Sequence, residues 1–250
     1  MPTFTSRTLS FLRALKRNND REWFRARKET YERDVRGPMI DLLARLATDL
    51  PAFAPELVSD PKVSLYRIYR DTRFSDDKSP LKTQIAAHFP HRGFPRGSGA
   101  GLYLEVGPQW IWMGGGIYRP SPPDLRAVRA HIAETHPRLH RIVTASAFTR
   151  LMGELAGERL SRVPRGYPSD HPAADYLRYT QLLAGREREP AFAVSPRFYT
   201  ELLATFRATV PLVRFLNEAI LTRLPQTPVL THDDAPRRTA AGARRPDPMW

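Results

Sequence analysis

The sequence predicts an α+β fold in which a central, mainly antiparallel sheet of about four or more strands is flanked by N-terminal and C-terminal helices. Apolar residues recur at helical spacing in the first and last thirds of the chain, whereas the middle third is rich in β-branched and aromatic residues. Tight turns connect the middle segments, and such turns join antiparallel strands. Helices that flank one sheet indicate a single domain over residues 1–224.

The N-terminal third is predicted to contain three helices. Phe11, Leu12 and Leu15 recur at helical spacing and form the apolar side of the first helix. Asp20 is suited to cap the second helix, because its carboxylate can accept hydrogen bonds from the first turn. Gly37-Pro38 is expected to end that helix and to begin the third, since glycine suits the position after a helix and proline suits a first turn.

The middle third is predicted to form four strands and a loop. Residues 91–101 hold four glycines and a proline, which is typical of a loop between strands. The turn at residues 107–109 is short enough to make the two strands beside it a hairpin. The predicted strands cover residues 62–70, 83–89, 101–106 and 109–113.

Alternation along the third of these strands separates two kinds of side chain. Leu102, Leu104 and Val106 share one face. Tyr103 and Glu105 share the other face. One side of the predicted sheet is therefore apolar and the other is polar.

The last third is predicted to be helical up to residue 224. Ser121, two prolines and Asp124 form a capping box with proline in the first turn. Further helices are expected over residues 172–183, 196–207 and 210–224, with Pro211 separating the last two or kinking them. The helical spacing ends at Pro225, and the composition of residues 225–250 predicts a disordered tail rich in proline and arginine.

The composition excludes several classes of protein. The chain has 250 residues and no cysteine, which excludes disulfide bonds, thiol nucleophiles and thiolate metal sites. No stretch approaches the roughly 20 apolar residues of a membrane-spanning helix, and the N-terminus lacks the pattern of a secretory signal. We therefore expect a cytoplasmic protein that does not bind a membrane.

The net charge is strongly positive but widely spread. Lys and Arg number 39 against 26 Asp and Glu, which gives a formal net charge of +13. A positive field favours anionic partners, nucleic acid among them. Because the arginines are scattered through most of the chain, local clusters are more informative than the total charge.

The densest polar cluster lies in residues 67–82, between two predicted strands. Lys78 and Lys82 belong to this segment and Lys62 lies close to it, although the chain otherwise prefers arginine, which indicates a local requirement for ammonium groups. We expect the cations of the segment to converge on a phosphate or carboxylate group. The predicted ligand-binding residues in this cluster are Arg67, Arg70, Arg73, Lys78 and Lys82.

Two aspartates of the same segment, Asp71 and Asp77, are the candidate catalytic residues. They can orient the cations, hold a divalent ion beside a polyphosphate, or take part in acid–base chemistry, although flanking cations favour their ionised form. In the alternative interpretation they form ion pairs that only pin the turn. If Val63 faces the core, Arg67 shares the buried face and requires a partner, which either interpretation can supply.

A glycine-rich element, G-G-G-I-Y-R-P at residues 114–120, runs into the helix that Ser121 caps. A helix N-terminus beside glycines can receive an anion, and Tyr118 and Arg119 would then contribute their side chains, with Tyr118 as a further ligand-binding residue. The element matches neither the dinucleotide-binding nor the P-loop motif. The preferred interpretation is that its glycines let the strand pack closely under another element.

The remaining aromatic residues and histidines give weaker evidence for a functional site than the charge cluster does. Trp110 and Trp112 alternate along the predicted hairpin, and we expect them to pack in the core, with stacking on nucleobases as the alternative. His88 and His91 lie beside the loop, where they are suited to acid–base chemistry, but no partner is identified. No set of histidines has a complete shell of metal ligands, and no cofactor is identified.

Four motifs resemble those of a known family. They are F-L-x-x-L-x-x-N-N-x-x-x-W-F at residues 11–24, R-I-Y-R-D-T-R-F-S-x-D-K-x-P-x-K at 67–82, G-G-G-I-Y-x-P at 114–120 and P-R-G-Y-P-x-D-H-P at 164–172. Together they resemble the bacterial and fungal family catalogued as domain of unknown function 2461, over about residues 4–221. Members usually carry P-Y-K where this chain has Pro80-Leu81-Lys82. The resemblance implies a single-domain protein and implies no known activity.

Three functional hypotheses follow. The first is a pocket for a small molecule that bears a phosphate or carboxylate group, with or without enzymatic activity, and it depends on the 67–82 cluster. The second is a nucleic-acid-binding module, which the net charge and the basic loop from Arg92 to Arg96 favour. The third is a protein-interaction module in which the charge cluster is structural.

Overall fold

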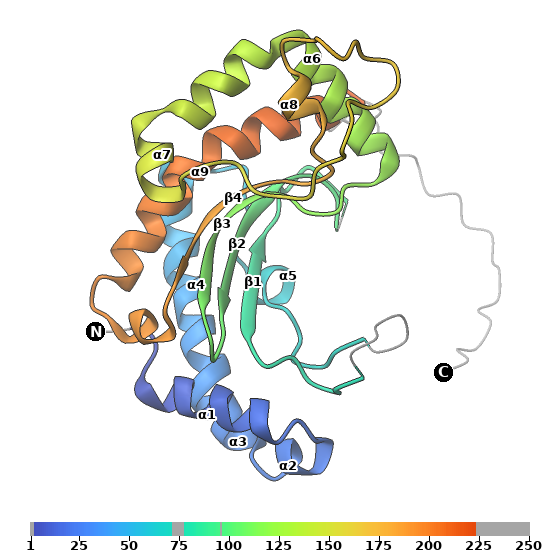
Figure 1. Cartoon of the computed structure of the whole chain (residues 1–250). Coiled ribbons are helices and arrows are strands. Elements are labelled where there is room, and N and C mark those ends of the chain that lie inside the picture. The colour runs from blue at the N-terminus through green and yellow to red at the C-terminus, as the bar shows by residue number, and fades with distance from the viewer. Residues whose placement is uncertain (1–2, 72–77, 96, 224–250) are drawn as a thin grey trace, which may run out of the picture.

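The computed structural model describes residues 3–71, 78–95 and 97–223, and Figure 1 shows how their helices and strands are arranged. The strands are β1 (Ile85–Phe89), β2 (Gly101–Val106), β3 (Ile111–Ile117) and β4 (Leu182–Arg188). They form one sheet in chain order, and every neighbouring pair is antiparallel. Together with the helices on both sides of it in the sequence, this sheet confirms the predicted α+β class.

Along the chain, helices precede the sheet and lie both before and after its last strand. The N-terminal ones are α1 (Ser6–Arg17), α2 (Arg21–Arg25), α3 (Lys28–Tyr31), the π-helical η1 (Glu32–Arg36), α4 (Gly37–Asp49), the 3-10 helix η2 (Leu50–Ala52) and α5 (Pro61–Ser64). The later ones are α6 (Pro122–Thr144), α7 (Ser146–Met152), α8 (Ala174–Leu177), the 3-10 helix η3 (Pro190–Val194) and α9 (Phe198–Leu221).

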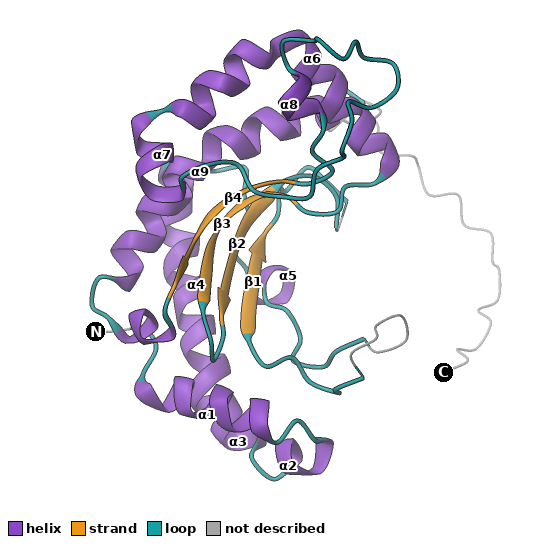
Figure 2. Ribbon diagram, viewed as in Figure 1, coloured by secondary structure: helices purple, strands orange, loops and turns teal. Residues whose placement is uncertain are grey.

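The two faces of the sheet differ, as the alternation along β2 predicts. Leu102, Leu104 and Val106 are fully buried on one face. Helix α9 packs against β2, β3 and β4, and its Phe206 meets Phe89 of β1 with ring centroids 5.3 Å apart. Figure 2 shows helices α4 and α9 along one side of the curved sheet and the other face turned away from them. The face that carries Tyr103 is therefore free to line a site.

Residues 62–70 do not form the predicted strand. Asp60 instead caps the short helix α5, because its Oδ1 accepts a hydrogen bond from the backbone N–H of Lys62 at 2.7 Å. Pro61 occupies the first turn, where its fixed φ suits a helix. Val63 is 46% exposed, so the condition under which Arg67 would share a buried face is not met. The helix-start signal outweighs the β propensity of the residues that follow it.

Residues 172–183 do not form the predicted helix either. Helix α8 covers only part of this range, and the chain then enters β4. Two arginines of β4 pair with one carboxylate of α9: Arg188 is bidentate to Glu201 at 2.8 and 3.0 Å, and Arg186 reaches it at 3.2 Å. Pairing with β3 and with α9, rather than local propensity, therefore fixes this strand.

Residues 196–207 and 210–224 belong largely to one helix, α9, with Pro211 inside it, so the alternative in which Pro211 separates two helices is wrong. Buried Phe206 and Phe215 on either side of that proline hold the helix against the core. At Gly37 the π-helical η1 runs directly into α4 without a break.

No helix within residues 3–71, 78–95 and 97–223 is long and apolar enough to cross a membrane. The tail predicted for residues 225–250 lies outside the described residues.

Candidate functional site

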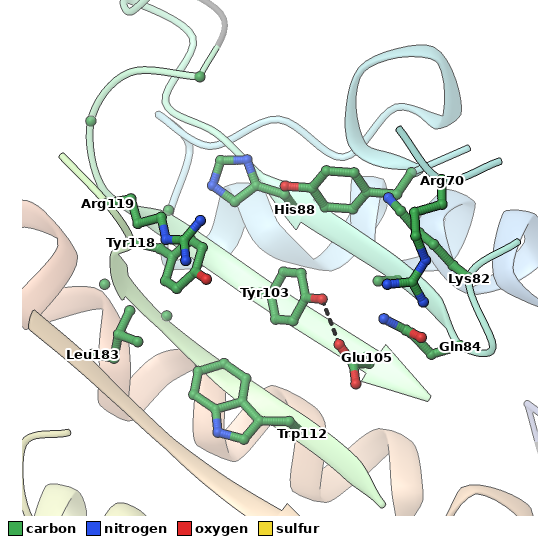
Figure 3. A pocket seen from close by; sticks show the side chains of 17 residues that line it. Arg70, Lys82, Gln84, His88, Tyr103, Glu105, Trp112, Tyr118, Arg119 and Leu183 are labelled. Atoms are coloured by element: carbon green, nitrogen blue, oxygen red, sulfur yellow. Dashed lines mark hydrogen bonds between the residues drawn. The ribbon is translucent and has the colours of Figure 1, made fainter. Parts of the chain in front are cut away.

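The open face of the sheet lines a cavity of about 760 Å³, shown in Figure 3. The register of the strands brings together the side chains that form the floor of this cavity. Glu105 of β2 lies opposite Trp112 of β3, and Tyr103 lies opposite His88 of β1. All four side chains line the cavity, because positions two apart on a strand share a face.

Glycines on the neighbouring strands make room for the larger rings. A Cβ atom at Gly101 would lie 2.4 Å from His88 Nε2, and one at Gly185 would lie 2.4 Å from Trp112 Cζ2. The indole of Trp112 therefore lies over β4 and lines the cavity. The expected core packing of the two tryptophans is wrong, since Trp110 is 41% exposed and Trp112 faces the cavity.

A hairpin-like segment supplies one end of the cavity. Residues 68–70 and 80–82 pair in antiparallel fashion, with a bridge between Tyr69 and Leu81. The side chains of Arg70 and Lys82 leave the same side of this pairing, because their positions alternate with the bridge. Figure 3 shows both at the same end of the cavity.

The N-terminal helices hold this hairpin. The side chain of Asn19 accepts a hydrogen bond from the backbone N–H of Leu81 at 3.1 Å and donates one to its carbonyl at 2.9 Å. Leu81 is fully buried, so an apolar side chain fills the space at this position. Two of the motifs quoted above, at residues 11–24 and 67–82, thus meet in space.

The cations at this end lie close to one another. Burial, reinforced by the charges of Arg67 and Arg70, lowers the pKa of Lys82. Its Nζ lies 4.8 Å from the ring centroid of Tyr66, which offers a partial compensation through the electron-rich face. An anion bound here would relieve the repulsion between the cations.

Glu105 lines the cavity beside Arg70 and Lys82 (Figure 3). Its Oε2 accepts a hydrogen bond from the Tyr103 hydroxyl at 2.8 Å, and its Oε1 accepts one from Trp110 Nε1 at 3.0 Å. Burial and the neighbouring Glu105 charge raise the pKa of Tyr103 well above its usual range. Tyr103 therefore keeps its proton as a donor, and the carboxylate has a fixed orientation.

The opposite end of the cavity carries Tyr118 and Arg119 (Figure 3). Tyr118 is 64% exposed, and the Arg119 guanidinium lies 5.3 Å from its ring centroid. Arg119 has φ of 48°, a left-handed conformation that costs roughly 1–2 kcal/mol for a residue with a Cβ atom. Such backbone outliers gather at binding and active sites.

The predicted ligand-binding residues are only partly brought together. Arg70, Lys82 and Tyr118 line the cavity. Arg67 and Lys78 are exposed and are not among the lining residues. Arg67 therefore does not need the buried partner that a core-facing strand position would have required. Arg73 lies outside the described residues.

The predicted catalytic aspartates are not among the lining residues that the structure describes. Asp71 is exposed, and Asp77 lies outside the described residues. Sequence reasoning did not assign Glu105 or Trp112 to the site, whereas it named Arg119 beside Tyr118 as a contributor if the glycine-rich element forms a site. The alternation that puts Tyr103 and Glu105 on the polar face of β2 was a signal for the first of these.

His88 makes the stability of the protein depend on pH. Burial lowers the pKa of its imidazole, so the side chain stays neutral in the folded protein when the unfolded chain begins to bind a proton near pH 6.5. Stability is therefore present above that pH and lost as the pH falls, by up to about 1.4 kcal/mol per pH unit for one proton. We expect His88→Gln to remove this part of the loss.

Urea denaturation of wild type and His88→Gln at pH 7.5, 6.5 and 5.5 measures this difference. The free energy of unfolding of wild type should fall relative to the variant as the pH decreases. Parallel pH profiles for the two proteins would show that His88 titrates alike in the folded and unfolded states.

Within the described residues, no group of three or more His, Cys, Asp or Glu side chains is arranged to hold a metal ion. The cavity instead offers cations at both ends, aromatic rings and one carboxylate.

The comparisons place the chain in a family. No curated protein and no solved structure matches it. The family model described as "Conserved hypothetical protein (DUF2461)" matches residues 7–215, which include the N-terminal helices, all four strands and most of α9. The chain therefore belongs to the DUF2461 family, as the four sequence motifs predicted.

Proposed function

We propose that the protein binds a small molecule with a phosphate or carboxylate group in the cavity on the open face of the sheet. The observation that carries this proposal is the convergence of Arg70, Lys82 and Arg119 on one cavity of about 760 Å³. Small-molecule pockets typically have about 300–1,000 Å³ and combine apolar or aromatic walls with a few polar groups.

The charges that line the cavity support an anionic ligand. Three cationic side chains line it against one carboxylate, Glu105, among the residues that the structure describes. Arginine gives an anion bidentate hydrogen bonds, and lysine supplies a compact charge. The lowered pKa of Lys82 reflects an ammonium group that burial and like charges disfavour, a condition that a bound anion would reverse.

Substitution of the lining cations tests the proposal. We expect Arg70→Gln and Lys82→Met each to weaken binding of inorganic phosphate, pyrophosphate or citrate at least tenfold, since a hydrogen bond to a charged group contributes about 1.5–3 kcal/mol. Methionine keeps the apolar stem of Lys82 beside Tyr66, which preserves the packing. Isothermal titration calorimetry measures the affinities, and thermal unfolding checks the fold of each variant.

Two neighbouring cations provide matched controls. Arg67→Gln and Lys78→Met remove the same charges from the same segment, but these residues are exposed and lie outside the lining. The charge of Arg67 acts on Lys82, so Arg67→Gln measures the effect of a nearby charge that does not line the cavity. For both controls the loss of anion affinity should stay below about threefold, because a cation without a direct contact to the anion contributes only a charge that salt screens. Equal losses for lining and control variants would contradict a defined pocket and indicate binding to the general positive field.

The nucleic-acid alternative has a distinct outcome in the same experiment. A module that binds the backbone of RNA or DNA would lose affinity steeply with salt and would respond to Arg67 and Arg70 alike. An oligonucleotide that binds with this salt dependence, together with no measurable binding of the small anions, would favour the alternative over the pocket.

A further inference from the structure

We infer that the ligand is a ribonucleoside phosphate, bound with its phosphate at the Arg70 end, its ribose at Glu105 and its base on Trp112. This inference rests on the proposed function, since it names the class of anion that the cavity takes. It is carried by the order in which different chemical groups follow one another along the cavity.

That order matches the three parts of a nucleotide. Figure 3 shows Arg70 and Lys82 at one end of the cavity and Tyr118 and Arg119 at the other, with Glu105 beside the first pair. The charge of Glu105 acts on Lys82 and counters the lowering of its pKa, which indicates that the two groups are near each other. A ligand in this cavity thus meets cations, then a hydrogen-bond acceptor, then aromatic rings.

Glu105 has the capacity to receive two hydroxyl groups. A carboxylate offers about four lone-pair sites, and Tyr103 and Trp110 each use one, on different oxygens. Among the residues that the structure describes, these two bonds leave one site on each oxygen for a further donor. Vicinal hydroxyls, such as those of ribose, can donate to both oxygens of a carboxylate whose orientation is already fixed.

The rings beside Glu105 form a platform of the size of a base. Trp112 lies next to Glu105 across the strand pair and covers Gly185, so the indole lies low on the sheet. Tyr103 meets it with ring centroids 5.8 Å apart and an interplanar angle of 53°. Every nucleobase has a flat face that stacks on such rings, with a contribution of about tenfold or more in affinity.

A sugar phosphate or a simple dianion uses fewer of these features. Inorganic phosphate engages only the cations, and ribose 5-phosphate engages the cations and Glu105 but leaves Trp112 without a stacking partner. Affinity should therefore rise in steps from phosphate to ribose 5-phosphate to a nucleoside 5′-monophosphate.

The experiment compares ligands and variants in a cycle. Calorimetry with the full chain gives affinities for AMP, GMP, CMP and UMP, for 2′-dAMP, for ribose 5-phosphate and for inorganic phosphate. We expect the best ribonucleotide to bind at least tenfold more tightly than its 2′-deoxy form and than ribose 5-phosphate. A hydrogen bond to a charged group supports a preference of that size.

The variant Glu105→Gln tests the assignment of the ribose. It should reduce the ratio of AMP to dAMP affinity from at least tenfold to near one, even if the loss of a negative charge tightens phosphate binding. The matched control is Glu187→Gln, because Glu187 lies in the same cross-strand row, is exposed and does not line the cavity. The control should keep the wild-type ratio.

The variant Trp112→Ala tests the stacking platform, and Trp112→Phe keeps a ring if the alanine variant is unstable. The alanine variant should bring AMP down to the affinity of ribose 5-phosphate, whereas phenylalanine should retain part of the difference. A 5′-phosphorylated RNA tetranucleotide separates a free nucleotide from an RNA end. Tighter binding of the tetranucleotide than of the mononucleotides would overturn the free nucleotide as the ligand.

The outcomes separate this inference from the proposed function. If phosphate and ribose 5-phosphate bind in an Arg70-dependent manner but no nucleotide binds more tightly, the inference is wrong and the anion pocket stands. An AMP to dAMP ratio that Glu105→Gln leaves unchanged also overturns it. If none of these ligands binds, this inference is wrong, and if pyrophosphate and citrate do not bind either, the proposed function is also wrong.

Discussion

Gly116→Ala is expected to destabilise the protein by about 3 kcal/mol or more, because two penalties coincide at this position. Gly116 has φ of +132°, a conformation that residues with a side chain rarely adopt. A Cβ atom there would also lie 2.1 Å from the carbonyl oxygen of Leu182 in β4. Neither strand can move away without breaking the β3–β4 ladder. Urea denaturation followed by far-UV circular dichroism measures the loss.

Gly166→Ala is the matched control for this substitution. Gly166 also has a positive φ, of 95°, but no atom lies within 4 Å of the place that its Cβ would take. The free energy of unfolding of this variant should fall only by the cost of the backbone conformation, about 1–2 kcal/mol. Equal losses at both glycines would mean that β4 can shift away from β3, contrary to the close approach described here.

Asn217→Ala is expected to cost about 2–4 kcal/mol of stability. Asn217 is buried in α9, and its side chain accepts a hydrogen bond from the Ala100 N–H at 2.7 Å and donates one to the Ala100 carbonyl at 3.0 Å. Alanine would leave two buried backbone groups without their partner, at about 1–3 kcal/mol each. The same variant should weaken ligand binding, because Ala100 lies between Gly99 and Gly101, which line the cavity.

Thr205→Val on the same helix should not lower the stability of the protein, in contrast to Asn217→Ala. Thr205 is fully buried, and its Oγ1 has no hydrogen-bond partner among the described residues. Valine has nearly the same shape, so it removes an unpaired hydroxyl without opening a cavity, and stability should stay equal or rise by about 1 kcal/mol. A loss comparable to that of Asn217→Ala would show that buried polar groups on α9 act through packing rather than through their hydrogen bonds.

The sequence predicts the fold well where the signals are local. The apolar spacing in α1, the Ser121 cap of α6 and the short β2–β3 turn depend on neighbouring residues, and each prediction is confirmed. The strand predicted at residues 62–70 and the helix predicted at residues 172–183 are wrong. In the second range, pairing with β3 and with Glu201 decides the outcome, and partners so distant in sequence leave no local pattern.

The candidate site is predictable in part for the same reason. Arg70 and Lys82 stand out because charge is dense around them, and both line the cavity. Trp112 and Glu105 belong to the open face only because α9 covers the opposite one, so their role depends on how a distant helix packs. The alternation along β2 indicated that Tyr103 and Glu105 share a face. The residues opposite them on the neighbouring strands could not be deduced from sequence spacing.

The connection between β3 and β4 has a consequence for the order of folding. Strands β1, β2 and β3 are joined by short segments and can pair early, whereas residues 118–181 separate β3 from β4. Contacts between distant parts of a chain form late, because closing a long loop costs entropy. Gly185, which the Trp112 indole covers, is therefore expected to dock late, and the cavity on the open face stays incomplete until β4 has paired with β3.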